Sequence, residues 1–364
     1  MKWFWRVREA RTVIILLAEI AFFTWYLWPE AGRSHPFLNG ANGLLILKYS
    51  SVYGIAAVGA AMVIISGGVD LSPGAVIALA GVVAGKLFVE SGYALTTSLA
   101  AGIGVGVLAG VVTAALVVLV GLPPFIATLG MMGVARGAAF IITEGRFFDV
   151  SGALPPGWRP LGIPIAWLAP SVMIALGLLF QALMNAFQWG RAVYAVGGNE
   201  TAALYSGIPV AWLAPAVMIA LGVGFQVLMH RFQWGRAVYA VGGNETAALY
   251  SGIAVGKVKT SVYLLAATLA AVAGIVLVVV QGQGKADLAT GYELDIIASA
   301  VVGGASLSGG RGSVLGAVLG TLIFGVLRNA LPQIPGATFY DRLIVGLVVI
   351  VIVVMDQLMA RRGK

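Results

Sequence analysis

Long stretches without a charged side chain limit how this chain can fold more than any other feature. Residues 94–121 and 343–355 contain no Asp, Glu, Lys or Arg, and only 10% of the 364 residues are charged while 60% are hydrophobic. A helix of about 20 apolar residues crosses a hydrocarbon core of about 30 Å. It also satisfies its own backbone hydrogen bonds there. The sequence therefore predicts an all-α polytopic membrane protein.

Apolar segments recur along the whole chain, with short polar connectors between them. Two of them, 73–90 and 294–308, are short and begin or end in Gly, Ser and Asp clusters, so we expect broken or re-entrant helices there. No change in composition marks a boundary, which predicts a single transmembrane domain over 1–364. The eleven apolar segments are 12–29, 50–67, 73–90, 94–120, 126–143, 165–184, 210–229, 260–280, 294–308, 312–330 and 338–356.

Basic residues gather at the two chain ends, and the formal net charge is +8. Four lie between positions 2 and 11, before the first apolar segment, and three lie between 361 and 364, after the last. Cytoplasmic flanks of membrane proteins carry this excess of Lys and Arg. The pattern predicts that both termini lie in the cytoplasm, and it argues against nucleic-acid binding.

A tandem repeat of 45 residues occupies the middle of the chain. Residues 162–206 are followed at once by 207–251, and the two copies differ at seven positions. Each copy contains one apolar segment followed by an identical, more polar stretch, residues 187–206 in the first copy and 232–251 in the second. Solenoid arrays need three or more diverged units, so a recent duplication or an artefact explains this repeat better.

The string GGNETAALYSG, residues 242–252, predicts a helix of about two turns. Asn244 suits the N-cap, Glu245 suits the positive helix start, and Gly252 suits a left-handed end. One interpretation is an ordinary connector between two spans, which the capping pattern alone favours. The other is a coupling helix that docks on a separate motor subunit.

The string SGGVDLSPGA, residues 66–75, predicts a helix break. Ser72 is placed to cap a helix whose first residue is Pro73, and Gly67 and Gly68 let the preceding helix unwind. Broken helices line the substrate cavities of transporters. The alternative is an interfacial turn with Asp70 in water. Residues 291–312, GYELDIIASAVVGGASLSGGRG, offer a similar break in the second half.

Few ionisable groups fall inside the apolar segments. Arg136 is one of them. A charged side chain in lipid has a high free-energy cost, so we expect Arg136 to be buried in protein or to face a cavity. Asp70 is one partner that would satisfy it. The other such groups are Asp295 and Arg328.

No enzyme signature is present. The nearest match to a phosphate loop, GVVAGKL at 81–87, has the wrong spacing and lacks the hydroxyl residue. Neither His35 nor His230 has a second ligand at metal-binding spacing, and the chain has no Cys. We therefore expect a non-enzymatic chain without a catalytic residue, a metal or a cofactor of its own.

Four strings together resemble the ribose/xylose/galactose-type permeases of the branched-chain amino acid and simple sugar permease family. They occur in family order and span most of the chain from 49 to 346. The resemblance implies an ABC importer with a core of ten helices per subunit, to which this chain adds one duplicated apolar segment. The strings are MVIISGGVDLSPGAVIALAG, PPFIATLGMMGVARGAAF, RAVYAVGGNETAALYSGI and GYELDIIASAVVGGASLSGGRGSVLGAVLGTLIFG.

The same resemblance implies the partners. These are ATP-binding cassette ATPase subunits that carry ATP and Mg²⁺, a periplasmic sugar-binding protein, and a second permease subunit, identical or different. The expected function is ATP-driven import of a monosaccharide. A stand-alone secondary transporter or channel for a small polar solute is the alternative, and the scarcity of ionisable groups in the spans disfavours it.

The resemblance places the family's cytoplasmic coupling segment on 242–252, and the charges favour this second copy over the first. Basic side chains surround the second loop, whereas the first has only Arg191. The first copy's apolar segment is expected to lie outside the bundle without spanning the membrane; the alternative is that it spans and forces a neighbouring segment to re-enter. The coupling residues are Gly243, Asn244, Glu245, Thr246, Ala247, Ala248, Ser251 and Gly252, and the substrate pathway is expected to include Ser66, Gly67, Gly68, Asp70, Ser72, Pro73, Arg136, Gly303, Gly304 and Ser306.

Overall fold

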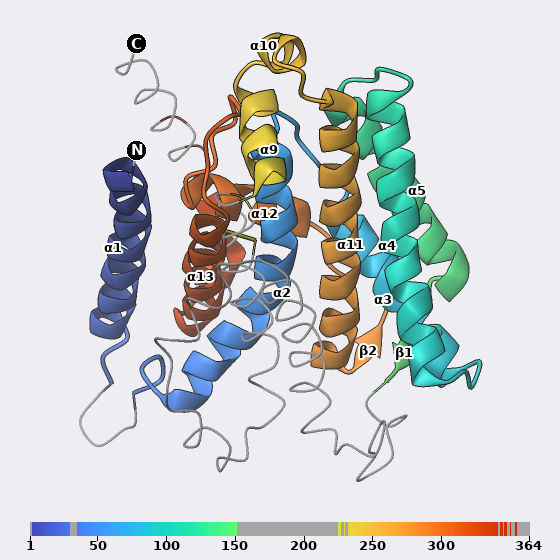
Figure 1. The fold of residues 1–364 in the computed structure, drawn as a ribbon. Helices are drawn as coiled ribbons and strands as arrows, with labels where there is room; N and C mark the ends of the chain where they lie inside the picture. The colour runs from blue at the N-terminus through green and yellow to red at the C-terminus, as the bar shows by residue number, and fades with distance from the viewer. Residues whose placement is uncertain are drawn as a thin grey trace, which may run out of the picture.

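The computed structural model describes residues 2–29, 35–150 and 232–340, with a few further positions at 225–229 and 343–354, and these residues are largely helical (Figure 1). Five of the described helices are long and apolar enough to cross a membrane. The all-α polytopic prediction is therefore confirmed. The predicted segment 165–184, and most of 210–229 and 338–356, lie outside the described residues.

The long helices overlap the predicted apolar segments, although the first two begin ten residues before the predicted segments 12–29 and 50–67. The long ones are α1 (Lys2–Tyr26), α2 (Gly40–Ile65), α3 (Pro73–Val89), α4 (Leu95–Val118), α5 (Pro124–Thr143), α11 (Val255–Gln281) and α13 (Val314–Ala330). The short elements are α9 (Gln233–Gly243), α10 (Glu245–Tyr250), α12 (Tyr292–Val302), the 3-10 turns η3 (Leu331–Gln333) and η4 (Ala337–Tyr340), and the strands β1 (Phe148–Asp149) and β2 (Gln283–Gly284).

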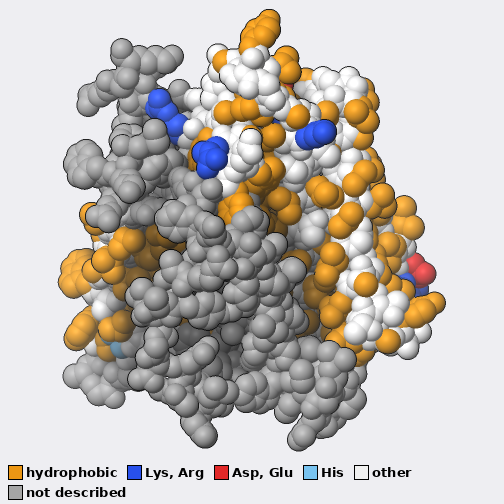
Figure 2. All heavy atoms as spheres, in the orientation of Figure 1, with side chains coloured by type: hydrophobic (Ala, Val, Ile, Leu, Met, Phe, Trp, Pro, Cys, Tyr) orange, Lys and Arg blue, Asp and Glu red, His pale blue; other side chains and the backbone are white. Residues whose placement is uncertain are grey.

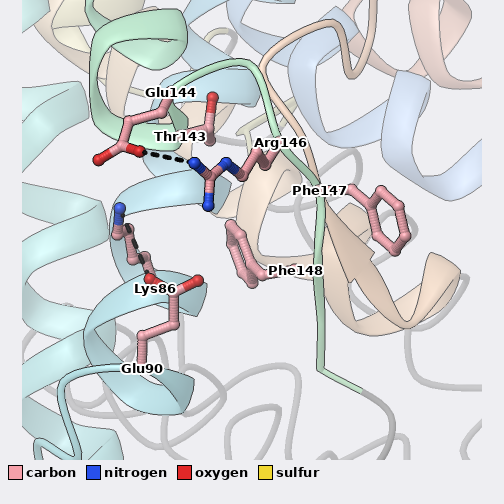
Figure 3. A pocket seen from close by; sticks show the side chains of 7 residues that line it. All are labelled: Lys86, Glu90, Thr143, Glu144, Arg146, Phe147 and Phe148. Carbon is pink, nitrogen blue, oxygen red and sulfur yellow. Dashed lines mark ion pairs between the residues drawn. The ribbon is translucent and has the colours of Figure 1, made fainter.

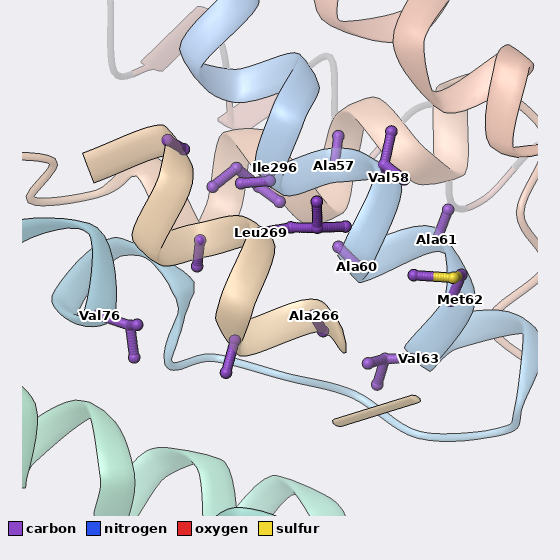
Figure 4. Close-up of a cluster of buried hydrophobic side chains, with 14 of the residues drawn as sticks. Ala57, Val58, Ala60, Ala61, Met62, Val63, Val76, Ala266, Leu269 and Ile296 are labelled. Atoms are coloured by element: carbon purple, nitrogen blue, oxygen red, sulfur yellow. The ribbon is translucent and has the colours of Figure 1, made fainter. Parts of the chain in front are cut away.

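Helix α11 lies at the centre of the bundle, packed against α2, α3 and α4 (Figure 1). Small residues let these backbones approach closely. A Cβ added at Gly59 of α2 would lie 2.7 Å from the Cα of Ala266, and one at Gly81 of α3 would lie 2.7 Å from the carbonyl oxygen of Gly274. Small aliphatic side chains of α2 and α11 fill the space around these contacts (Figure 4). Because lipid removes the hydrophobic driving force for helix association, van der Waals contacts between closely packed helices take its place.

The outer side of the bundle is apolar. Leu108 of α4, Leu119 directly after it, and Val134 and Ile141 of α5 are each more exposed than buried. Hydrophobic side chains run down this side of the molecule in Figure 2. An exposed apolar surface of this extent is typical of a face that contacts lipid.

Two helices are interrupted. Helix α2 ends at Ile65 and the chain resumes in α3 at Pro73, while α12 ends at Val302 and the chain resumes in α13 at Val314. We call residues 66–72 the first break and residues 303–313 the second break. The prediction of short, broken helices at these two places is confirmed.

The two ends of the bundle differ. Helix α10 and the start of α1 lie toward one end, and the antiparallel pair of β1 and β2 lies at the other (Figure 1). On the face shown in Figure 2, Lys and Arg side chains gather mainly at the α10 end.

Candidate functional site

Helix α10 is built as its sequence predicts. The side chain of Asn244 accepts a hydrogen bond from the backbone N–H of Ala247 at 2.9 Å, and Glu245 is the first helical residue. Gly252 follows the helix with φ of +80°, the left-handed conformation that ends it. These capping predictions are confirmed.

Helix α10 projects from the bundle, and its base is held on α11. Of its six residues only Ala248 is buried, and Leu249 and Tyr250 present large apolar side chains to the outside. A carboxylate oxygen of Glu245 lies 2.7 Å from Nζ of Lys259 at the start of α11. The result is an exposed helix fixed to a buried one, which suits a docking element.

The first break begins with a glycine motif that closes α2. Gly67, at φ of +86°, donates its N–H to the carbonyl of Ile64, and Gly68 donates to the carbonyl of Val63. This pair of bonds is the Schellman motif, which satisfies the last carbonyl groups of a helix.

The rest of the first break is held by Asp70. Its Oδ1 accepts hydrogen bonds from the backbone N–H of Ser72 at 2.8 Å and from the Ser72 hydroxyl at 2.7 Å. The sequence predicted Ser72 as the capping side chain, and this is wrong because its hydroxyl is turned toward Asp70 and makes no cap bond to α3. Asp70 is 3% exposed, so the alternative of an acid in water is also wrong.

The second break repeats this design at its start. Gly304, at φ of +101°, donates to Val301, and Ala305 donates to Ala300. At its other end the Ser313 hydroxyl accepts from the N–H of Gly316 at 2.9 Å and caps α13. Both breaks therefore begin with a glycine motif that closes a helix, but only the second ends with a side chain that caps the next helix.

The two breaks meet each other and the end of α9. The N–H of Gly310 in the second break donates to the carbonyl of Ile65, the last residue of α2, at 2.8 Å. Gly242, next to last in α9, lies against both groups. We call Gly67, Gly242, Gly309 and Gly310 the glycine junction. The segment that leads into α10 thus contacts both breaks, which sequence reasoning did not foresee.

Most of the predicted pathway residues are buried, although Gly67 is exposed and Arg136 is only partly buried. Ser66, Ser72 and Ser306 are 3%, 2% and 6% exposed, and Gly303 and Gly304 are buried beneath α13. A Cβ at Gly303 would overlap the backbone of Gly316. The residues are gathered around one closed contact between the two halves of the bundle.

Arg136 lies apart from this group. Its Nη1 donates to the carbonyls of Ala286 and Leu288, at 2.8 and 2.6 Å, in the connection between β2 and α12. Thr128, two turns earlier on α5, is the residue that reaches the first break, through the carbonyl of Val69. Arg136 lies eight residues beyond Thr128, about 12 Å further along α5. It therefore holds the connection between β2 and α12 and does not pair with Asp70 in the first break.

An ion pair links the helices that flank the second break. Nη2 of Arg328 on α13 lies 2.7 Å from Oδ2 of Asp295 on α12, and the Asp295 side chain is 2% exposed. Sequence reasoning noted both residues separately but did not pair them. Their separation of 33 positions gives no periodic signal, although opposite charges inside apolar segments are expected to find each other.

A polar pocket lies at the end opposite α10, where α3 and α5 approach β1 (Figure 3). Its volume is about 200 Å³. Two ion pairs line it, Lys86 with Glu90 at 3.5 Å and Arg146 with Glu144 at 3.6 Å. Both members of the second pair are largely exposed. The two cations and two anions balance, so the pocket carries no net charge.

The described residues contain no group of three or more His, Asp or Glu that would hold a metal. His35 is engaged structurally, since its Nδ1 accepts from the backbone N–H groups of Phe37 and Leu38.

Interrupted helices buried in an apolar bundle place the protein among multi-span membrane permeases. Comparison with known sequences gives the family. The family described as branched-chain amino acid transport system / permease component matches residues 42–224 and 213–353. The chain belongs to this family.

Several curated relatives match almost the whole chain. The ribose import permease protein of Escherichia coli (strain K12) is 33% identical over 360 residues, which cover 96% of this chain and 94% of the relative. The D-allose transport system permease protein of the same strain is 31% identical, covering 96% and 92%. The fructose import permease protein of Rhizobium meliloti is 30% identical, covering 88% and 79%. No solved structure matches the chain.

Proposed function

We propose that this chain is the membrane-spanning subunit of an ATP-driven importer for a monosaccharide in a bacterial inner membrane. Its similarity to permeases named for ribose, allose and fructose supports a sugar substrate. A periplasmic binding protein delivers the sugar, and separate ATP-binding cassette subunits carry ATP and Mg²⁺. A second permease subunit completes the pore.

The observation that carries this proposal is the exposed helix α10, joined through Gly242 to both breaks. An ATPase subunit needs a surface on which to dock and a structural connection from that surface to the substrate pathway. Helix α10 offers Leu249 and Tyr250 as apolar contacts, and basic side chains gather at its end of the molecule (Figure 2). The positive-inside rule then puts this end, with the N-terminus, in the cytoplasm.

The coupling helix is the one in the second copy of the repeat, Asn244–Ser251. Three residues of this copy hold the second break and its helix: Gln226, Tyr239 and Gly242. The corresponding loop of the first copy, Asn199–Ser206, lies outside the described residues.

The substrate pathway runs through the two breaks. Their hydroxyl side chains, from Ser66, Ser72 and Ser306, suit a neutral polyol, since each sugar hydroxyl needs a hydrogen-bond partner when it leaves water. Asp70 is buried and already engaged by Ser72, so this wall favours a neutral solute over an ionic one.

Uptake of labelled monosaccharides into proteoliposomes tests the proposal. The full chain is reconstituted with and without its ATPase and sugar-binding protein, and uptake is expected only with both partners and ATP. Transport by this chain alone would contradict the proposal and support a stand-alone transporter.

A charge reversal tests which copy couples. Glu245→Arg removes the ion pair with Lys259 and places two cations together at the base of α10, so uptake is expected to be lost. The matched control is Glu200→Arg, the same change in the first copy, which is expected to do little. Deletion of residues 162–206 is likewise expected to preserve uptake. A silent Glu245→Arg beside a damaging Glu200→Arg would reverse the assignment.

A further inference from the structure

Three segments from distant parts of the chain meet at one carbonyl group. The carbonyl oxygen of Ile65 accepts the N–H of Gly310, and a Cβ added at Gly242 would overlap that same oxygen. The added Cβ would also lie 2.7 Å from the N–H nitrogen of Gly310. The end of α9 is therefore seated directly on the backbone of both breaks.

Gly309 completes this contact from the other side. A Cβ there would overlap the carbonyl oxygen of Gly242 and lie 3.0 Å from the Cα of Gly67. Its φ of +75° also disfavours any residue with a side chain. Three backbone segments thus touch at the four glycines of the junction with no side chain between them.

Three further hydrogen bonds tie α9 and nearby Gln226 to the second break and to the start of α13. The hydroxyl of Tyr239 donates to the carbonyl of Gly312 at 3.0 Å. Oε1 of Gln226 accepts the N–H groups of Val314 and Leu315 at 2.7 and 3.0 Å. The contact at Gly242 is accordingly supported by side-chain bonds on either side of it.

A contact between backbones transmits displacement differently from a contact between side chains. Side chains can absorb a shift by turning about their χ angles, between or slightly away from staggered rotamers. The glycine junction has no rotamer to change, and close-packed interiors pass strain on rather than absorb it. Asn244, which caps α10, is two residues from Gly242.

We propose that Gly242 is the positioning residue through which movement of α10 displaces both breaks together. A shift of α10 pushes the carbonyl of Ile65 at the end of α2 and the loop at Gly309 and Gly310 as one unit. The proposal rests on the proposed function, and it adds the physical route between the motor and the sugar pathway.

Two adjacent glycines provide a matched test. Gly242→Ala places a methyl group on the Ile65 carbonyl, whereas Gly243→Ala meets nothing closer than the Cα of Gly310 at 3.9 Å. The full complex, reconstituted with its ATPase and binding protein, is assayed for sugar uptake and ATP hydrolysis. Gly242→Ala is expected to keep hydrolysis but lower the sugar moved per ATP about tenfold, within the usual range of coupling between sites. Gly243→Ala is expected to lower this ratio much less than Gly242→Ala does, because its methyl group displaces neither break.

A milder pair of variants decides the question if Gly242→Ala does not assemble. Tyr239→Phe removes the bond from α9 to the second break, and Ser261→Ala removes the bond from α9 to α11, where the indole N–H of Trp234 donates at 2.7 Å. A lower ratio of sugar to ATP is expected for Tyr239→Phe alone.

The outcomes separate the two proposals. A wild-type complex without ATP-dependent uptake overturns the proposed function, and this inference with it. A functional wild type beside a Gly242→Ala variant with an unchanged ratio overturns the inference alone. Equal ratios for Tyr239→Phe and Ser261→Ala overturn it in the same way.

Discussion

The two breaks share one construction but are stabilised differently. Each follows a helix closed by a glycine in the left-handed conformation, Gly67 in the first and Gly304 in the second. The first break is held from within, by Asp70 and Ser72. The second has two backbone bonds of its own, from Ser306 to Arg311 and from Gly309 to Ser306, and it is also bonded from outside by Ile65, Tyr239 and Gln226. The first break therefore relies on a buried carboxylate of its own, and the second makes more contacts with residues of α9 and with Gln226.

The largest expected effect concerns the ion pair beside the second break. Arg328→Gln leaves Asp295 buried without its charged partner, which typically destabilises a protein by about 3–5 kcal/mol. We expect a marked fall in thermal stability of the purified protein in detergent. The double variant with Asp295→Asn should recover much of the loss, because no charge then remains buried. Equal instability of the single and double variants would show that the pair does not hold α12 to α13.

A smaller effect is expected in the first break. Asp70→Ala removes the acceptor for two hydrogen bonds and leaves the backbone N–H and hydroxyl of Ser72 buried, at a cost of about 1–3 kcal/mol. Asp70→Asn is the control, since its carbonyl oxygen still accepts both bonds. Thermal melting compares the two variants. A melting temperature for Asp70→Ala equal to that of Asp70→Asn would mean that the break is not held from within.

The external support of the second break is tested by a pair of variants in the repeat. Gln226→Ala removes the side chain that accepts from the first turn of α13, which is expected to cost about 1 kcal/mol, as for other helix caps. Gln181→Ala makes the same change in the first copy and is expected to be silent. The melting temperatures of the two variants are compared with the wild type. A lower melting temperature for Gln181→Ala than for Gln226→Ala would show that the first copy of the repeat supports the second break.

The smallest expected effect is a difference in accessibility. The chain has no native Cys, so Ser72→Cys and Ser306→Cys each introduce a single thiol, one in each break. Both sites are buried at rest, and slow labelling by a maleimide is expected. Turnover with ATP, sugar and both partners should accelerate labelling at Ser306→Cys more than at Ser72→Cys, because the second break depends on α9. A labelling rate that does not change with turnover at either site would show that the breaks are not part of the substrate pathway.

The sequence alone determined the features that depend on neighbouring residues. Apolar runs of membrane-spanning length predicted the helices, since a lipid environment leaves the backbone few alternatives. Local capping rules placed both ends of α10, with Asn244 and Gly252 in their expected roles. The resemblance in four ordered strings identified the family.

Only the tertiary structure decided which distant groups meet. The sequence predicted that the Ser72 hydroxyl caps α3, but in the structure it donates to the buried carboxylate of Asp70 instead. Arg136 was free to pair with any nearby acid, but the path of the connector after β2 gave it two carbonyls. The contact of Gly242 with Ile65 and Gly310 joins segments far apart in the chain. Such contacts depend on how the helices pack in three dimensions, and a glycine carries no side chain by which sequence patterns predict its neighbours.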